Sequence, residues 1–162
     1  MIEILEKKDY RQITNEMRLE FAAVSSNEAF ARMAVSAFIA PLNPTLEELS
    51  DVKTAVSEAV TNAILHGYEN KGSVTDRVQM NCALKNDVLE VEIIDRGVGM
   101  ADVGRAMEPL FTTRPEWERS GMGFAFMEAF MDDLEVISEP EQGTLVRMYK
   151  KLGLNAWIGN EE

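Results

Sequence analysis

Two apolar segments joined by three polar residues constrain the fold of this chain most strongly. Residues 78–84 and 88–94 each have the length and apolar content of a β-strand, and only Lys85, Asn86 and Asp87 separate them. A connection this short joins antiparallel neighbours, because a parallel pair needs a crossover of a dozen or more residues. The two segments therefore predict an antiparallel hairpin inside a larger sheet.

Three further strands are predicted around this hairpin. One starts at Asn15, where apolar and charged residues alternate, and two more cover residues 134–138 and 144–149. Residues 139–143 between the last two are expected to form their turn. The long segment 97–121 has weak periodicity and several glycines, and a segment of this kind inside a compact domain is usually functional.

Three helices complete the expected fold. The first follows residues 25–27, ends at Pro41 and has apolar residues at helical spacing: Phe30, Met33, Ala34, Ala37 and Phe38. A long second helix starts at a capping box of Thr45 and Glu48 and ends near Gly67, a typical C-terminal stop. A third covers residues 123–131. The order of elements predicts an α+β fold, a two-layer sandwich with helices on one face of a mixed, mainly antiparallel sheet.

Composition limits the classes of function. The formal net charge of −12 argues against sequence-independent binding to nucleic acid, which needs a basic surface, and it suits basic partners. A single cysteine permits no intramolecular disulfide and is typical of a reducing compartment. No run approaches the ~18 apolar residues of a membrane span. We expect one cytoplasmic domain over residues 15–151, with an extension (1–14), a tail (152–162), no membrane contact and no direct DNA binding.

Glu58 and Asn62 are the first candidate functional residues. They lie four apart on the long helix, so they share one face beside its apolar face. A carboxylate and an amide next to a core cost free energy unless they have partners. They could form an ordinary hydrogen-bonded helix edge. They could also form a phosphate site, in which the Asn62 oxygen binds Mg²⁺ and Glu58 orients or deprotonates an attacking hydroxyl.

Two glycine pairs at the ends of the long irregular segment are the next candidates. Asp95 ends a strand just before Gly97 and Gly99, where a flat ligand can approach the backbone and a carboxylate can accept a hydrogen bond from its amine. Gly121 and Gly123 open a helix, whose N-terminal amides favour an anion. Thr144, at the start of the last strand, could form a hydrogen bond to a base through its hydroxyl group. Each pattern alone is also typical of ordinary turns and strands.

Taken in order, these patterns resemble the Bergerat ATP-binding fold of the GHKL superfamily, which gyrase, Hsp90, MutL and histidine kinases share. Other stretches are similar to the small serine kinases that double as anti-sigma factors, and most of all to the sporulation anti-sigma F family of Firmicutes. These stretches are residues 15–17, 57–68, 109–113 and 118–124. The resemblance covers about residues 15–150.

The resemblance implies ATP or ADP together with Mg²⁺ as ligands. Glu58 would be the catalytic base, Asn62 would bind Mg²⁺ and Asp95 would contact the adenine amine. The base pocket would be lined by Gly97, Gly99 and Thr144. A lid over about residues 104–120 would bring the catalytic Arg119 to the phosphates. The other nucleotide contacts would come from Thr112, Thr113, Ser120, Gly121, Met122 and Gly123.

The resemblance also implies two activities and their partners. The chain would transfer the γ-phosphoryl group of ATP to a serine of a STAS-type anti-anti-sigma protein. As a homodimer it would hold the sporulation sigma factor F away from RNA polymerase, and Arg32 would contact a partner.

Two alternatives stay open. The chain could sequester a sigma factor in an ATP-gated way without kinase activity, or it could be the equivalent kinase for a general-stress sigma factor. A histidine kinase is disfavoured, because the single histidine, His66, lies on the helix that carries Glu58 and Asn62.

Overall fold

A five-stranded sheet forms one layer of the molecule. The computed structural model describes residues 12–108 and 123–153. Within them the strand order is β1-β2-β3-β5-β4, and all four pairings are antiparallel. The strands are β1 (Asn15–Ala22), β2 (Arg77–Lys85), β3 (Val88–Asp95), β4 (Asp133–Glu139) and β5 (Gly143–Lys151). The prediction of a mainly antiparallel sheet is confirmed, and the described strands contain no parallel pair.

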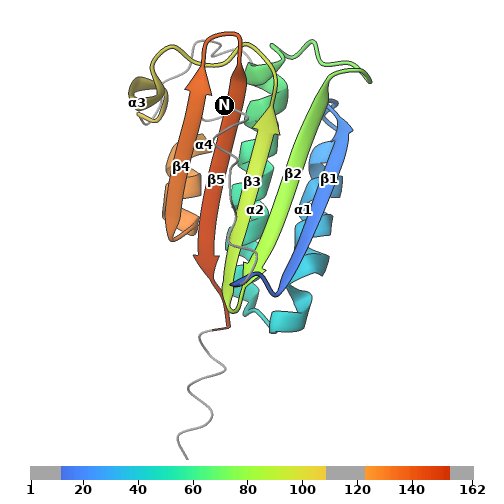
Figure 1. Ribbon diagram of the computed structural model, residues 1–162, viewed down its shortest axis with the longest axis vertical. Coiled ribbons are helices and arrows are strands. Elements are labelled where there is room, and N and C mark those ends of the chain that lie inside the picture. The colour runs from blue at the N-terminus through green and yellow to red at the C-terminus, as the bar shows by residue number, and fades with distance from the viewer. Residues whose placement is uncertain (1–11, 109–122, 154–162) are drawn as a thin grey trace, which may run out of the picture.

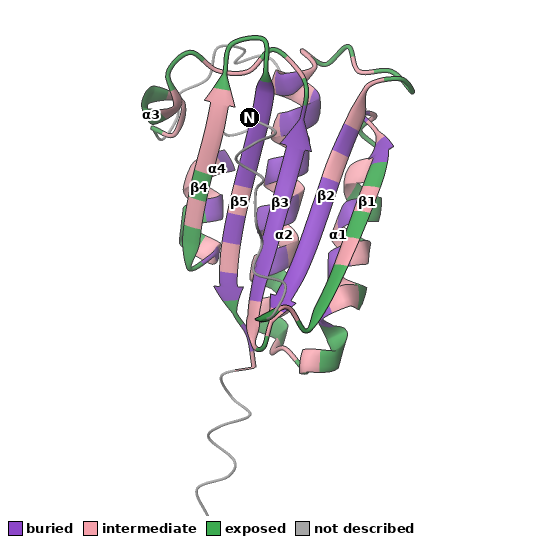
Figure 2. Cartoon of the chain, in the orientation of Figure 1, coloured by how far each residue is buried: buried purple, intermediate pink, exposed green. Residues whose placement is uncertain are grey.

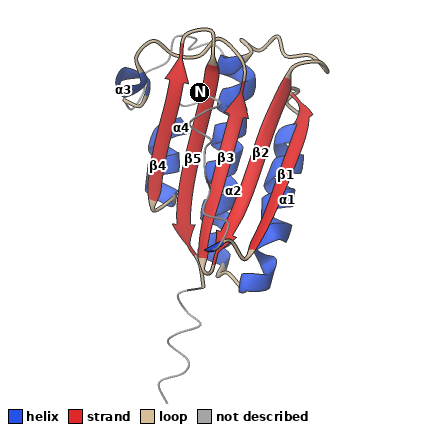
Figure 3. Ribbon diagram, viewed as in Figure 1, coloured by secondary structure: helices blue, strands red, loops and turns tan. Residues whose placement is uncertain are grey.

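Helices form the second layer, behind the sheet in the view of Figure 1 and blue in Figure 3. The three that cover the sheet are α1 (Asn27–Ile39), α2 (Leu46–Asn62) and α4 (Gly123–Phe130). The shorter elements are the 3₁₀ turn η3 (Ala40–Leu42), the π-helical turn η4 (Ala63–Gly67), which continues α2, and α3 (Val103–Ala106). The two-layer α+β prediction is therefore confirmed.

The core lies between the two layers and is centred on α2. Val52, Val56 and Val60 of this helix are fully buried, as its apolar spacing predicts. The predicted capping box fixes where α2 begins. Thr45 Oγ1 accepts a hydrogen bond from the Glu48 amide at 3.0 Å, and the Glu48 carboxylate accepts one from the Thr45 amide at 3.0 Å. The capping box thus fixes the start of the helix that carries Glu58 and Asn62.

Helix α1 buries only part of the face that its spacing suggested, with Ala34 and Phe38 partly buried against the core. Ala31, Val35 and Ile39 are fully buried, whereas Phe30 is 52% exposed and Met33 is 62% exposed. The helix has apolar residues around most of its circumference, so spacing alone does not select the buried face. The face with Ala31 and Val35 packs inward because its small side chains let α1 approach α2 closely. Phe30 and Met33 consequently form an exposed apolar surface.

Candidate functional site

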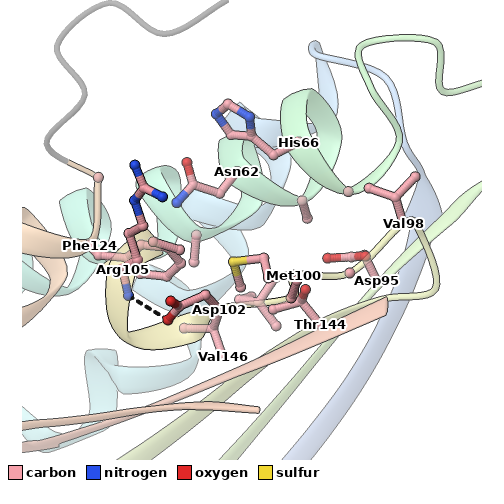
Figure 4. Close-up of a pocket in the computed structure, with 18 of the residues that line it drawn as sticks. Asn62, His66, Asp95, Val98, Met100, Asp102, Arg105, Phe124, Thr144 and Val146 are labelled. Carbon is pink, nitrogen blue, oxygen red and sulfur yellow. Dashed lines mark hydrogen bonds between the residues drawn. The ribbon is translucent and has the colours of Figure 1, made fainter. Parts of the chain in front are cut away.

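A cavity of about 320 Å³ lies between α2, α4 and the adjoining ends of β3 and β5. Its volume is typical of a site for a small molecule. Figure 4 shows Asn62 and His66 on one side, with Asp95 and Thr144 on the other. The sequence-predicted residues that line it are Asn62, Asp95, Gly99, Gly123 and Thr144. The structure therefore brings together residues that are up to 82 positions apart in the chain.

Asp95 is a nearly buried carboxyl group at one end of the cavity. It is 4% exposed, and its Oδ1 accepts a hydrogen bond from the Gly97 amide at 2.9 Å. Burial raises the pKa of Asp95 to about 7, against the opposing effect of the Gly97 and Thr144 amides. A carboxyl group held in this way presents an acceptor to any donor that enters the cavity, such as an exocyclic amine.

Two glycine residues, Gly67 and Gly97, lie close together beside Asp95. A Cβ built on Gly67 would lie 2.7 Å from Asp95 Oδ1, and one on Gly97 would lie 1.8 Å from the Gly67 oxygen. The Val98 amide donates to that same oxygen at 2.9 Å. The prediction that the helical stretch ends at Gly67 is confirmed, since Gly67 closes the π-helical turn η4. Gly67 has no positive φ, and its position requires glycine because Asp95 occupies the side-chain space.

The turn after Asp95 is fixed to the last two strands. Gly99 has a φ of +67°, the left-handed region that favours glycine. The next amide, of Met100, donates to Ser138 Oγ at 2.8 Å, and that hydroxyl lies 2.8 Å from Thr144 Oγ1. Thr144 itself is 8% exposed and lines the cavity. These bonds hold the wall of the cavity against β4 and β5.

The Glu58–Asn62 face of α2 meets the start of α4. A Cβ built on Gly123 would lie 3.0 Å from Asn62 Nδ2 and 3.4 Å from Glu58 Oε2. Asn62 lines the cavity, whereas Glu58 lies one turn further back and does not line it. No group of three or more His, Cys, Asp or Glu side chains suited to a metal occurs in residues 12–108 and 123–153. A cation here would therefore depend on oxygen atoms of a ligand as well as on Asn62.

Sequence reasoning missed part of the cavity wall. Residues after Gly99 were expected to be irregular, yet α3 lies among them, with Asp102 Oδ1 accepting a hydrogen bond from the Arg105 amide at 2.9 Å (dashed line in Figure 4). Asp102, Arg105 and His66 all line the cavity. An aspartate three residues before the donating amide is an N-cap signal that could have found α3.

Several predicted residues lie elsewhere. Arg32 is on α1, with a side chain 40% exposed and 3.5 Å from Glu28 Oε1, and it does not line the cavity. The remaining predicted site residues lie outside the described residues: Thr112, Thr113, Arg119, Ser120, Gly121 and Met122.

Comparison with known proteins places this chain in a family. Residues 21–150 match the histidine kinase-like ATPase domain. An anti-sigma F factor from Oceanobacillus iheyensis is 54% identical over 146 residues, which are 90% of this chain and 99% of the relative. The chain belongs to the anti-sigma F factor family. Another anti-sigma F factor, from Clostridium botulinum, is 56% identical over 140 residues, covering 86% of this chain and 96% of the relative.

A solved structure supports the fold of this anti-sigma F family member. The RsbU and RsbW domains of a Mycobacterium tuberculosis protein match it with a TM-score of 0.58 and 18% identity. The match covers 86% of this chain but only 32% of that longer chain. Within the described residues, no helix has the length and apolar character needed to cross a membrane.

Membership of an ATPase domain family implies nucleotide binding. Asp95 offers the cavity a buried acceptor for an amine, and Gly67 beside it also lines the cavity. Ile93 and Val146 add apolar walls for a flat ring.

Proposed function

We propose that this chain is an ATP-dependent anti-sigma factor and protein serine kinase. It binds and inhibits sigma factor F, and it phosphorylates a serine of a STAS-type anti-anti-sigma partner. The observation that carries the proposal is the contact of Gly123 with the Glu58–Asn62 face beside a cavity that holds Asp95. The identity of 54–56% to anti-sigma F factors over nearly their whole length supports the choice of partner.

Nucleotide recognition is assigned to the two ends of the cavity. The adenine amine donates to Asp95, beside Thr144 and the backbone of Gly97 and Gly99. The phosphates lie toward Asn62 and the start of α4, where the oxygen of Asn62 is a ligand suited to Mg²⁺ and backbone amides favour anions. The contacts assigned to Arg119 and the rest of the lid rest on the family resemblance.

Phosphoryl transfer needs a base close to this phosphate end. Glu58 lies one helical turn from Asn62 and accepts the proton of the partner's serine hydroxyl. The hydroxyl oxygen bonds to the γ-phosphorus as the bond between that phosphorus and the oxygen of ADP breaks. Because the transition state is loose, most of the catalysis comes from positioning and charge stabilisation. Bound ATP supplies the phosphoryl group.

Partner binding and dimerisation are assigned to α1. Phe30 and Met33 expose apolar surface near Arg32, and an apolar patch beside an arginine is typical of protein interfaces. Glu28 pairs with Arg32 and also accepts a hydrogen bond from Ser57 Oγ. Ser57 precedes Glu58, so this contact joins the proposed partner helix to the proposed catalytic helix.

The test is phosphorylation of the STAS-type partner with labelled ATP and Mg²⁺. Glu58→Gln is expected to abolish labelling and to leave ATP affinity nearly unchanged, because Glu58 does not line the cavity. Glu47→Gln is the matched control, since Glu47 is an exposed glutamate on the same helix, and it is expected to label normally.

Each other outcome selects against part of the proposal. Native labelling by Glu58→Gln would remove Glu58 from the mechanism. No labelling by the unaltered chain, with ATP-dependent sigma binding intact, would make it a sequestering module without kinase activity. Preferential capture of a general-stress sigma factor over sigma F in parallel binding assays would replace the proposed partner.

A further inference from the structure

Strand β3 ends at Asp95, and the chain leaves the sheet there. Figure 2 shows β3 buried along almost its whole length. The last pair of the β2–β3 ladder joins Val78 to Asp95, and the next residues on the two sides are Arg77 and Arg96. The position of the Asp95 carboxyl group therefore depends on how the backbone is held just beyond the end of the ladder.

The hydroxyl group of Tyr68 lies where that next pair would be. It accepts a hydrogen bond from the Arg96 amide at 3.0 Å and donates one to the Arg77 oxygen at 2.5 Å. An amide of one strand and a carbonyl of its neighbour are the groups that a ladder ordinarily joins directly. The hydroxyl group thus bridges the two chain segments at the point where they separate.

The first three amides after Asp95 all donate hydrogen bonds. The first donates to the Tyr68 hydroxyl, the second to Asp95 Oδ1 at 2.9 Å, and the third, of Val98, to the Gly67 oxygen at 2.9 Å. Gly67 and Tyr68 are adjacent at the end of the α2–η4 helix, so this helix end holds the turn. Because the first amide belongs to the peptide group that follows Asp95, the hydroxyl acts one peptide bond away from that residue.

Tyr68 acts from outside the cavity. It does not line the cavity, and it packs against the core. Burial raises the pKa of its hydroxyl group against the opposing effect of the Arg96 amide, and the charge of Asp95 raises this pKa further. The hydroxyl group is therefore protonated at neutral pH, so it can donate to the Arg77 oxygen while it accepts from the Arg96 amide.

We propose that Tyr68 is a positioning residue for recognition of the adenine base. Its hydroxyl group sets where the Asp95 carboxyl group meets the exocyclic amine, and Tyr68 itself does not touch the nucleotide. This rests on the proposed function, in which Asp95 accepts a hydrogen bond from that amine. A hydroxyl group with a merely structural role would stabilise the domain without favouring one base over another.

The first experiment uses Tyr68→Phe in the full-length chain, which removes the hydroxyl group and keeps the ring. Affinities are measured for ATP and for purine riboside triphosphate, whose base lacks the exocyclic amine. We expect the variant to bind ATP on the order of tenfold more weakly, because the acceptor for the amine is misplaced, and to bind the analogue normally. Tyr149→Phe is the matched control, since Tyr149 is also half-buried and outside the cavity, and it should keep both affinities.

The second experiment asks whether the hydroxyl group acts through Asp95. In a double-mutant cycle, Tyr68→Phe should weaken ATP binding much less in the Asp95→Asn chain than in the unaltered chain. Additive losses would overturn the proposal. Equal weakening of ATP and the analogue, native affinity of Tyr68→Phe for both, or an unfolded Tyr68→Phe chain by circular dichroism would also overturn it.

The unaltered chain separates this proposal from the function on which it rests. If it prefers ATP to purine riboside triphosphate, the role assigned to Asp95 is supported, and the two experiments then decide the role of Tyr68. Equal affinity of the unaltered chain for the two ligands would remove the role of Asp95 and overturn the proposal with it.

Discussion

Gly67 and Asp95 lie so close that the Asp95 carboxyl group occupies the space where a side chain on Gly67 would be. The Cβ position of Gly67 is 2.7 Å from Asp95 Oδ1. The last turn of the α2–η4 helix is therefore shaped around the residue to which we assign adenine recognition.

Gly67→Ala is expected to weaken both stability and nucleotide binding. The new methyl group has to displace Asp95, at a cost of about 1–3 kcal/mol in the free energy of unfolding. Denaturant titration and ATP binding measure the two effects. Gly104→Ala is the control, since the nearest atom to its Cβ position is 3.6 Å away, and it is expected to be neutral or slightly stabilising. Equal behaviour of the two variants would contradict the steric argument.

Asp95→Asn is expected to change how stability depends on pH. Burial raises the pKa of Asp95 from 3.8 to about 7, so the folded chain keeps a proton that the unfolded chain loses. This contribution to stability is complete below pH 3.8 and is lost as pH rises through about 7. The variant lacks that loss, so its unfolding free energy falls less over this range. Parallel stability curves for both proteins would refute the assigned pKa.

The same substitution is expected to weaken ATP binding. An amide oxygen replaces a carboxylate as the acceptor for the adenine amine, and hydrogen bonds to charged groups contribute about 1.5–3 kcal/mol. Calorimetry above pH 7, where Asp95 is ionised, measures the loss. GTP, which has no amine at the corresponding ring position, serves as the comparison and is expected to show little change. An unaltered ATP affinity would place the adenine elsewhere.

Asn62→Ala is expected to remove most of the effect of Mg²⁺ on ATP binding. Asn62 lines the cavity at its α4 end, and no multi-residue metal cluster among the described residues offers a substitute. The affinity for ATP is measured with Mg²⁺ and with a chelator, and the two values should converge in the variant. Asn15→Ala, at the exposed start of β1, should keep the native difference. A variant with the native Mg²⁺ effect would exclude Asn62 as a ligand.

Thr45→Ala is expected to lower stability without affecting the site. The variant loses the hydrogen bond from the Glu48 amide, and loss of an N-cap costs about 1 kcal/mol. Thermal unfolding measures this cost, and ATP affinity should remain native because Thr45 does not line the cavity. Ser50→Ala, at an exposed position on the same helix, should leave stability nearly unchanged.

Features encoded by neighbouring residues could be predicted from the sequence. The hairpin of β2 and β3, the capping box at Thr45 and the buried face of α2 each depend on residues close together in the chain. The fold class followed from their order. Asp95, Gly99 and Thr144 could be predicted as candidate site residues because strand ends and glycine turns have recognisable local sequence patterns. The resemblance to a known family then implied that the three residues belong to one site.

Features decided by packing could not be predicted in this way. Two apolar faces of α1 compete, and only contact with α2 shows that Val35 faces inward while Met33 does not. The requirement for glycine at position 67 arises from Asp95, 28 residues away. The part of the cavity wall at Arg105 depends on α3, whose four residues are too few for periodicity to show.

The position of β5 between β3 and β4 has a consequence for synthesis on the ribosome. Thr144 and Val146 of the cavity lie on β5, the final strand of the sheet. Asn62 precedes them by more than eighty residues in the chain, and Asp95 precedes them by about fifty. Domains form as their segments leave the ribosome, N-terminal parts first. A nascent chain that has not released β5 lacks one wall of the nucleotide cavity, so ligand capture becomes possible only when translation of the domain is almost finished.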